Sequence, residues 1–253
     1  MQLVLATLLI CHMGGPGTAK QAQPVVDKFL RHLERSGGWP AQSLQGTYAT
    51  RPARCAKLWE QDKPTIVVTD LATYLSHRKT WKLTPVAHMG PANGLTYHLL
   101  VREGGAKKLA EISGKTILTP MANTPRFIAR VVFGGKLPAS ALTLKHTRRP
   151  LRAIRALARG KVDAALVDAT AYGYLGELKL PKKLISIYRS AGMPQLTLAL
   201  AGKSGAAERK RLQRALPKLC QGPGAELCKT FGVTSFTPAK KALYKRLERR
   251  YGR

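Results

Sequence analysis

Residues 122–126 have the side chains needed to hold an anion. Asn123 brings an amide, Thr124 a hydroxyl and Arg126 a guanidinium, and Pro125 is typical of the first turn of a helix. Thr124 is the expected N-cap of that helix. The first backbone N–H groups of a helix have no partner inside it and point outward as donors. The segment therefore predicts a helix start that can neutralise a phosphate or a carboxylate.

Further candidate groups follow along the same stretch of chain. Arg148 and Arg149 precede a helix expected from about Pro150, and two adjacent guanidinium groups favour a doubly charged or larger anion. Asp168 ends a buried strand predicted over 162–167. It either accepts a hydrogen bond from a ligand amine or hydroxyl, or caps the helix expected from Thr170.

The elements that position these residues predict an α/β lobe. A strand is expected over 115–119, then the helix start at Pro125, a second strand, a basic helix over 150–159 that buries Leu151, Ile154 and Leu157, and the strand 162–167. Gly160 is expected to end the basic helix.

The rest of the chain alternates between strands and helices. The expected strands are 2–7, 44–48 and 65–69, and the expected helices are 20–34, 51–60 and 71–78. No Lys or Arg precedes the apolar run 3–10, which weakens its interpretation as a signal peptide. Residues 2–7 are assigned to a strand instead, because the first helix would otherwise have no neighbour in the sheet. The run 3–10 is also too short for a transmembrane helix.

This alternation predicts a mainly parallel sheet with helices on both faces. Two long strands, 96–102 and 196–201, mark two crossings between lobes, and the chain from about Ser204 onward is expected to be helical. The predicted domains are a discontinuous lobe 1, residues 1–95 plus 196–253, and a lobe 2, residues 96–195.

The charge balance points to an anionic partner. The 253 residues include 43 Lys and Arg and only 13 Asp and Glu, a formal net charge of +30. Nucleic acid is not the partner we expect, because aromatic residues make up only 6% of the chain and no strand interleaves them with cations. A basic module that binds nucleic acid or anionic lipid stays as the alternative.

The sequence gives no positive sign of an enzyme or of a cofactor. None of the six histidines has a Ser, Cys or carboxylate partner at a telling spacing, and the four cysteines do not have the spacing of a zinc site. Cys220 and Cys228 flank a Gly-Pro-Gly break, so they form either a local disulfide in an oxidising compartment or two free thiols.

Several short motifs occur in an order typical of one family. They are the strand 97–102, Leu-Ala-Glu-Ile-Ser-Gly-Lys-Thr at 109–116, Arg-Gly-Lys-Val-Asp-Ala-Ala at 159–165, Phe-Gly-Val at 231–233 and Phe-Thr-Pro-Ala at 236–239. With these motifs the chain resembles the substrate-binding proteins of phosphate, phosphite and phosphonate ABC transporters. They have the type 2 periplasmic binding fold, which consists of two α/β lobes joined by two crossing strands.

The resemblance implies a monomer without a cofactor that captures a small anion in an inter-lobe cleft, for an ABC permease, in the periplasm or at the outer face of the membrane. Members of the family usually have a ligand-binding tyrosine after the second strand, and Tyr48 matches this position. They also have a binding turn after the third strand, which here runs from Thr69 to Tyr74. Asp70 in that turn either meets a ligand amine or an Arg, or caps the next helix. The full set of predicted ligand-binding residues is Tyr48, Thr69, Tyr74, Asn123, Thr124, Arg126, Arg148, Arg149 and Asp168.

Overall fold

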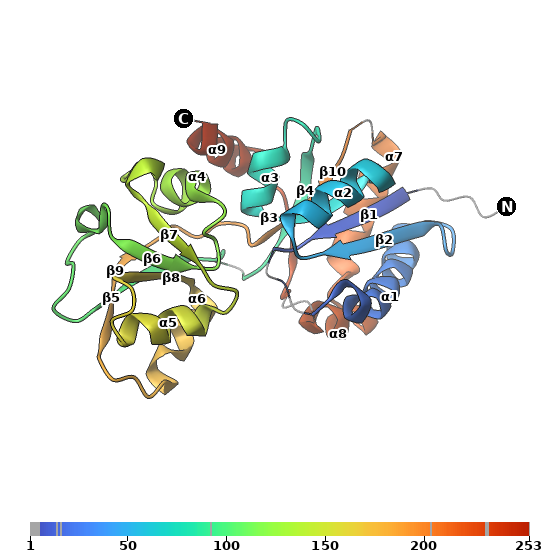
Figure 1. The fold of residues 1–253 in the computed structure, drawn as a ribbon. Coiled ribbons are helices and arrows are strands. Elements are labelled where there is room, and N and C mark those ends of the chain that lie inside the picture. Colours follow the sequence, from blue (N-terminus) through green and yellow to red (C-terminus); the bar gives the residue numbers. More distant parts are fainter. Residues whose placement is uncertain are drawn as a thin grey trace. The chain divides into compact units, whose positions relative to one another are not determined.

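The computed structural model divides into two compact units, which are shown in Figure 1. It describes residues 6–13, 15, 17–91, 93–202, 204–230 and 233–252. Unit 1 comprises Met1–Gly94 and Pro194–Tyr244, and unit 2 comprises Leu95–Met193 and Lys245–Arg253. The sequence prediction placed residues 245–253 in the first lobe, whereas in the structure they belong to unit 2.

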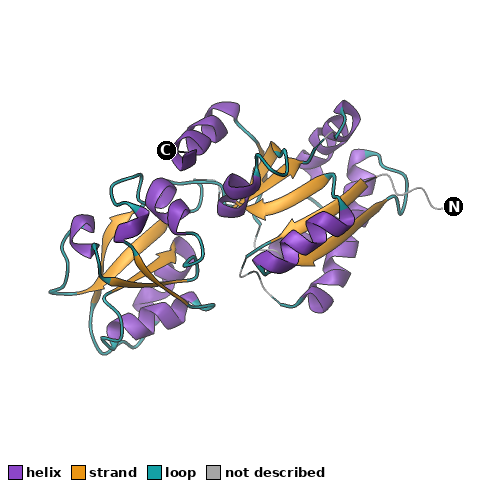
Figure 2. Ribbon diagram, turned by 45° about the horizontal axis from the view of Figure 1, so that its top comes forward, coloured by secondary structure: helices purple, strands orange, loops and turns teal. Residues whose placement is uncertain are grey.

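Unit 1 contains a six-stranded sheet with the order β11-β4-β10-β3-β1-β2. Its strands are β1 Ala6–Cys11, β2 Leu44–Ala49, β3 Ile66–Asp70, β4 Thr84–Met89, β10 Leu196–Leu200 and β11 Phe236–Pro238. β1 is parallel to β2 and β3, and β10 runs antiparallel between β3 and β4. The sheet is therefore mixed, with β2, β1 and β3 as its parallel part. Figure 2 shows the strands in orange between purple helices.

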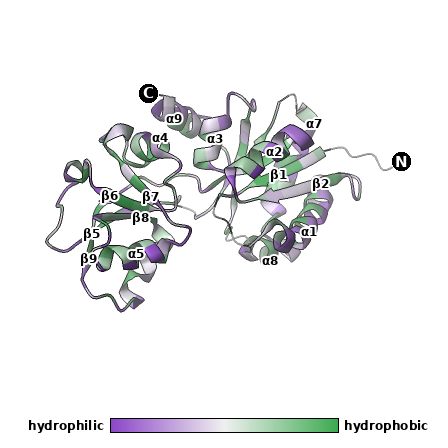
Figure 3. Ribbon diagram, in the orientation of Figure 1, coloured by the Kyte–Doolittle hydropathy of each residue, from purple (hydrophilic) through white to green (hydrophobic). Residues whose placement is uncertain are grey.

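Helices flank this sheet. They are α1 Ala19–Gly37, α2 Pro52–Asp62, α3 Leu71–His77, α7 Ala206–Ala215, α8 Pro223–Thr230 and the first residues of α9 Lys241–Gly252. Thr18 starts α1 with a capping box to Gln21, and Gly38 ends it at φ 77°. Val26, Leu30 and Leu33 of α1 pack on the sheet, which gives the helix its apolar face (Figure 3).

Two disulfides tie helices into unit 1. Cys11 at the end of β1 is bonded to Cys55 of α2, and Cys220 is bonded to Cys228 of α8. Cys220 and Cys228 were expected as either a disulfide or free thiols, and no local pattern pointed to the Cys11–Cys55 pair. That pair is 44 residues apart and comes together only when α2 packs on β1.

Unit 2 contains a five-stranded sheet with the order β7-β6-β8-β5-β9. Its strands are β5 Tyr97–Arg102, β6 Thr116–Thr119, β7 Thr143–His146, β8 Ala164–Asp168 and β9 Leu184–Arg189. β6 is parallel to β7 and β8, while β5 runs antiparallel to β8 and β9. The helical elements include α4 Pro125–Phe127, a π-helical segment Ile128–Val132, α5 Pro150–Ala158 and α6 Ala169–Gly173.

Several elements differ from the sequence prediction. β1 is Ala6–Cys11, so the first strand lies further along the chain than the predicted 2–7, and residues 2–5 are outside the described part. β4, β9 and β11 were not predicted, and β11 corrects the expectation that the chain is helical from Ser204 onward. β4 contains Pro85, which has no N–H to donate; the register of β10 shifts opposite it, between Leu198 and Ala199.

Candidate functional site

In unit 1, polar residues collect where the parallel strands end. The register aligns Cys11 of β1 with Thr69 of β3, and Thr69 with Thr197 of β10. Thr197 is in turn aligned with His88 of β4. Residues in one such row share a face of the sheet, so Thr69, Thr197 and His88 point to the same side. This row is the candidate site of unit 1.

Thr69 has the most unusual position in the row. Its side chain is fully buried, and its hydroxyl has no hydrogen-bond partner among the described residues. A buried hydroxyl without a partner is costly, and native structures usually avoid one unless it has a role. Nδ1 of His88 is likewise buried and unpartnered, so the row holds two polar atoms free to bond a ligand or a water molecule.

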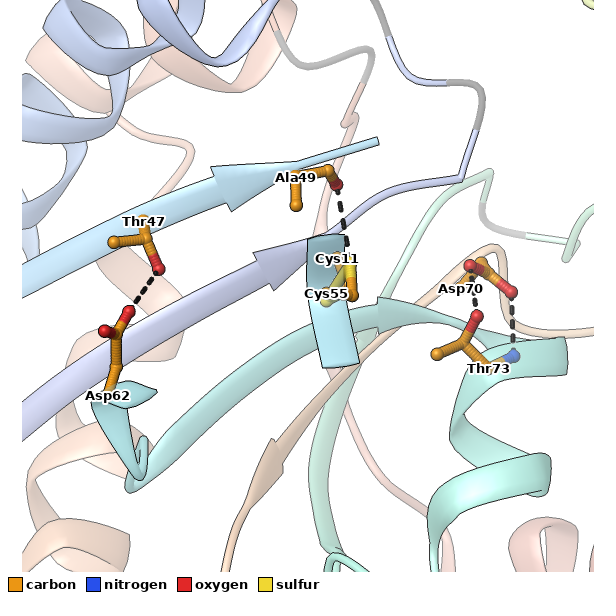
Figure 4. Close-up of a disulfide and its surroundings, with 7 residues drawn as sticks. All are labelled: Cys11, Thr47, Ala49, Cys55, Asp62, Asp70 and Thr73. Carbon is orange, nitrogen blue, oxygen red and sulfur yellow. Dashed lines mark hydrogen bonds between the residues drawn. A yellow bond between two sulfur atoms is a disulfide. The ribbon is translucent and has the colours of Figure 1, made fainter. Parts of the chain in front are cut away.

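Asp70 follows Thr69 directly and is already bonded within the protein. Its carboxylate accepts from the Thr73 backbone N–H and from the Thr73 hydroxyl, both at 2.9 Å, and so caps α3. Figure 4 shows this cap together with the Cys11–Cys55 disulfide. Of the two alternatives left open by the sequence, the structure therefore shows the cap.

A second cluster lies beside β1 and β2. A Cβ added at Gly15 would lie 2.5 Å from the Tyr48 hydroxyl oxygen and 2.7 Å from Nδ1 of His12, so only glycine fits there. Tyr48 is buried, and burial raises its pKa, so its hydroxyl stays protonated as a donor. Burial lowers the pKa of His12, and the charge of Asp70 acts in the opposite direction. His12 was not among the predicted site residues, although it directly follows β1, at the end of a parallel strand where ligands commonly bind.

Tyr74, the other tyrosine predicted in unit 1, lies in the core. Its side chain is fully buried, and its ring packs edge-on against Tyr244 with centroids 5.4 Å apart. The Tyr244 hydroxyl shares a hydrogen bond of 3.1 Å with the Thr197 hydroxyl. Tyr74 thus holds α3 against α9, and its role in binding a ligand stays a prediction.

In unit 2, the helix start at Pro125 exists but is not capped as predicted. The Thr124 hydroxyl donates to the Met121 carbonyl at 2.9 Å and makes no cap bond, which corrects its assignment as a capping side chain. Asn123 is exposed. The Thr119 hydroxyl, at the end of β6, accepts from the Met121 N–H at 3.2 Å and shapes the turn. The first helical N–H groups therefore lack a side-chain cap.

Arg126 has a partner that the sequence did not suggest. Its guanidinium donates to the Tyr251 carbonyl at 2.9 Å and to the Gly252 carbonyl at 3.2 Å, and it lies 5.0 Å from the centroid of the Tyr251 ring. These carbonyls belong to the last turn of α9, where cations are favourable. Arg126 is therefore bonded to α9, and the contact of Arg126 with an anion stays a prediction.

Arg148 and Arg149 lie just beyond β7, and both are exposed. The turn that carries them is fixed by Thr147, whose hydroxyl accepts from the Arg149 N–H at 3.3 Å. Asp168 ends β8 and accepts from the Ala171 N–H at 2.8 Å, so it caps α6. Asn123 and Thr124 thus follow the end of β6, and the two arginines follow the end of β7. These four residues are the candidate site of unit 2.

Other kinds of site find no support in the described part of the chain. There, no three His, Cys, Asp or Glu residues come close enough to hold a metal ion. Within the same residues, no helix has both the length and the apolar character needed to cross a membrane. The chemistry available at the strand ends is the binding of a small polar or anionic group by hydroxyls, amides and guanidinium groups.

The fold resembles solved structures of binding proteins. A Xanthomonas citri protein bound to ATP has a TM-score of 0.72 and 13% identity over 98% of this chain and 96% of that one. A binding component of a phosphonate ABC transporter from Pseudomonas aeruginosa has a TM-score of 0.64 and 13% identity, over 98% and 87%. A Prochlorococcus marinus protein in complex with methylphosphonate has a TM-score of 0.65 and 10% identity, over 97% of each chain.

At such low identities these likenesses show a shared fold, the two-lobed α/β fold expected from the sequence. No curated protein matches the sequence significantly. The model of the family described as "ABC transporter, phosphonate, periplasmic substrate-binding protein" matches residues 18–244. Since this match spans most of the chain, the protein belongs to the family of periplasmic substrate-binding proteins of phosphonate ABC transporters.

Proposed function

We propose that this protein binds a small oxyanion of the phosphate or phosphonate kind in the periplasm and delivers it to an ABC permease. The family is one of transport proteins rather than enzymes, which gives the class of function. The observation that carries the choice of ligand is the exposed pair Arg148 and Arg149 at the end of β7, held in a turn by Thr147. Paired guanidinium groups match the geometry and charge of a phosphoryl or phosphonyl group.

Each unit has its own candidate binding groups in this proposal. In unit 1 they are the unpartnered Thr69 hydroxyl and the Tyr48 hydroxyl, and in unit 2 they are Asn123, Thr124 and the two arginines. The Asp70 and Asp168 carboxylates accept bonds at the starts of α3 and α6, where the helix N-termini favour their negative charge.

Isothermal titration with phosphate, methylphosphonate, an alkyl sulfonate and a small carboxylate tests the proposal. We expect one phosphorus oxyanion to bind and Arg149→Ala to weaken its binding by about tenfold or more, because a charge-assisted hydrogen bond is lost. Arg159→Ala is the matched control, since Arg149 and Arg159 are exposed residues at the two ends of α5. The control should bind as the wild type does.

The melting temperatures of both variants should stay close to the wild-type value, since neither side chain is buried. A flat response to every anion would contradict the proposed function. An equal loss in Arg149→Ala and Arg159→Ala would show that general charge, and not this turn, attracts the anion.

A further inference from the structure

Unit 2 contains a long stretch of chain whose only charges are positive. Residues 112–162 include no Asp or Glu, and their charged residues are Lys115, Arg126, Arg130, Lys136, Lys145, Arg148, Arg149, Arg152, Arg155, Arg159 and Lys161. The ion pairs found among the described residues, Arg31–Glu34 and Lys183–Glu103, lie outside this stretch. Neither pair draws on this stretch, which therefore carries an excess of positive charge along the chain.

Helix α5 concentrates this charge on one face. Ala153, Ile154 and Leu157 are fully buried, whereas Arg152, Arg155 and Arg159 are exposed. Residues three and seven positions apart fall within an arc of about 60° on a helix of 3.6 residues per turn. These three arginines form one surface, the α5 basic face.

An exposed aromatic side chain lies on the same side of the unit 2 sheet. Tyr174 is 48% exposed and is the one large hydrophobic side chain exposed among the described residues. It starts a short 3₁₀ helix, Tyr174–Glu177, directly after α6. Leu175 of this segment packs on the core cluster that also receives Ile154 of α5. Figure 1 shows α5 and α6 on the same side of the unit 2 sheet.

We propose that the α5 basic face and Tyr174 dock unit 2 on a bilayer surface that contains anionic lipid. Arginine side chains bind phosphodiester headgroups while their stems lie against apolar groups, and a tyrosine ring suits the boundary between headgroups and acyl chains. The attachment is peripheral, since no helix in the described residues can span the bilayer. Each cation near such a surface strengthens binding by roughly fivefold, and salt weakens it.

Lipid fits this surface better than nucleic acid does. Proteins that bind single strands stack successive bases on several aromatic side chains, whereas Tyr174 is the one large aromatic side chain exposed among the residues that the structure describes. A bilayer surface needs no such series, because a few cations and one interfacial ring are enough for it. Nucleic acid is thus kept as an outcome of the test.

Vesicle flotation with the full-length protein tests the proposal. We expect binding to vesicles of phosphatidylcholine and phosphatidylglycerol, none to phosphatidylcholine alone, and release as salt rises from about 0.05 M to about 0.5 M. The triple variant Arg152→Gln, Arg155→Gln, Arg159→Gln should bind about a hundredfold more weakly. Tyr174→Ser should also bind more weakly, without any change in charge.

The matched control removes three cations from unit 1 instead. Lys210, Arg214 and Lys218 lie on or just after α7 and are exposed, so changing them to Gln lowers the net charge equally. This control should keep most of the vesicle binding. Both triple variants should melt like the wild type and should bind the small anion as before, which separates this proposal from the proposed function.

Three results would overturn the docking surface. One is the absence of binding to the phosphatidylglycerol vesicles, and another is an equal loss in the two triple variants. The third is tighter binding of a labelled duplex oligonucleotide, reduced in the α5 variant while its vesicle binding is unchanged. If the α5 triple variant does not fold, Arg155→Gln and Tyr174→Ser decide the outcome.

Discussion

At the scale of single residues, the polar side chains at the strand ends fall into two groups. Asp70, Asp168 and Thr124 already bond within their own turns. The Thr69 hydroxyl has no hydrogen-bond partner among the described residues, and the Arg149 side chain is exposed. Thr69 and Arg149 can therefore bind an anion without giving up a hydrogen bond within the protein, whereas the Thr124 hydroxyl would first have to release the Met121 carbonyl.

Thr69→Val should separate binding from stability. Valine keeps the shape of threonine and removes a buried hydroxyl that has no partner in the described residues, so the melting temperature should stay unchanged or rise. The affinity for the oxyanion should fall, because the donor is lost. Thermal unfolding and titration calorimetry on one sample check both. A lower melting temperature with unchanged affinity would mean that the hydroxyl serves the fold.

Arg126→Ala should act on α9 rather than on the ligand. The guanidinium is bonded to the Tyr251 and Gly252 carbonyls, so its loss should speed amide hydrogen exchange in the last turns of α9. Arg130→Ala is the control, as Arg130 lies one helical turn further along the same segment. Loss of oxyanion binding with α9 still protected from exchange would instead support the role that the sequence indicated for Arg126.

For Asp70 and Asp168 the sequence left two roles open, a helix cap or a ligand contact, because an aspartate suits both. An Asp before a helix can cap it or bind a ligand, and only the hydrogen bonds decide which. Arg126 is different, since its partner lies 125 residues away at the end of α9. No local pattern predicts a pairing over such a distance in the chain. The sequence therefore indicated Arg126 as a functional residue but not its bonds to α9.

At the scale of elements, the strongly patterned segments were predictable and the weakly patterned ones were not. The buried runs that became β3 and β8, and the helix α5 with its regular apolar spacing, follow from side-chain periodicity. β4 contains a proline, and β11 has three residues and forms only by pairing with β4. Tertiary pairing, rather than local preference, creates those two strands.

Leu166→Ala measures how far unit 2 depends on the central strand β8. Leu166 is fully buried, so its truncation should lower the free energy of unfolding by about 2–5 kcal/mol. Chemical denaturation gives this value, and the affinity of the folded protein for the oxyanion should change little. Leu151→Ala, on the partly buried edge of α5, should cost clearly less. Equal costs would mean that β8 is not the centre of this core.

At the scale of the whole molecule, the resemblance in the ordered motifs predicted the family, which the match over residues 18–244 confirms. The individual motifs are short, but their order along the chain reflects the order of strands and crossings in the fold. The boundaries of the lobes were harder to predict, because residues 245–253 join unit 2 through contacts such as Arg126–Tyr251.

Buried histidines should make the stability of the whole protein depend on pH. Burial is the main cause that lowers the pKa of His12, His77, His88 and His98 below the ordinary value of 6.5. As the pH falls through 6.5, the unfolded chain therefore takes up protons that the folded chain does not. The stability should be greatest above this pH and should decrease below it, as melting temperatures across a pH series will show.

His98→Asn should make that dependence less steep. The histidine stacks on Tyr172 and its Nδ1 contacts the Ser186 hydroxyl at 3.2 Å, a contact that the asparagine amide can replace. The control is His146→Asn, at an exposed position at the end of β7. An unchanged pH profile in His98→Asn would show that this histidine contributes nothing to the acid sensitivity.

The pairing of the four cysteines bears on how the chain matures. Cys11 is joined to Cys55 and Cys220 to Cys228, so each cysteine bonds to its immediate neighbour in the order of synthesis. Four cysteines allow three pairings, and this is the one in which no loop encloses or interlocks with another. A chain entering an oxidising compartment from its N-terminus completes each bond as the next thiol arrives. An oxidase is then sufficient, and no isomerase is required to exchange partners.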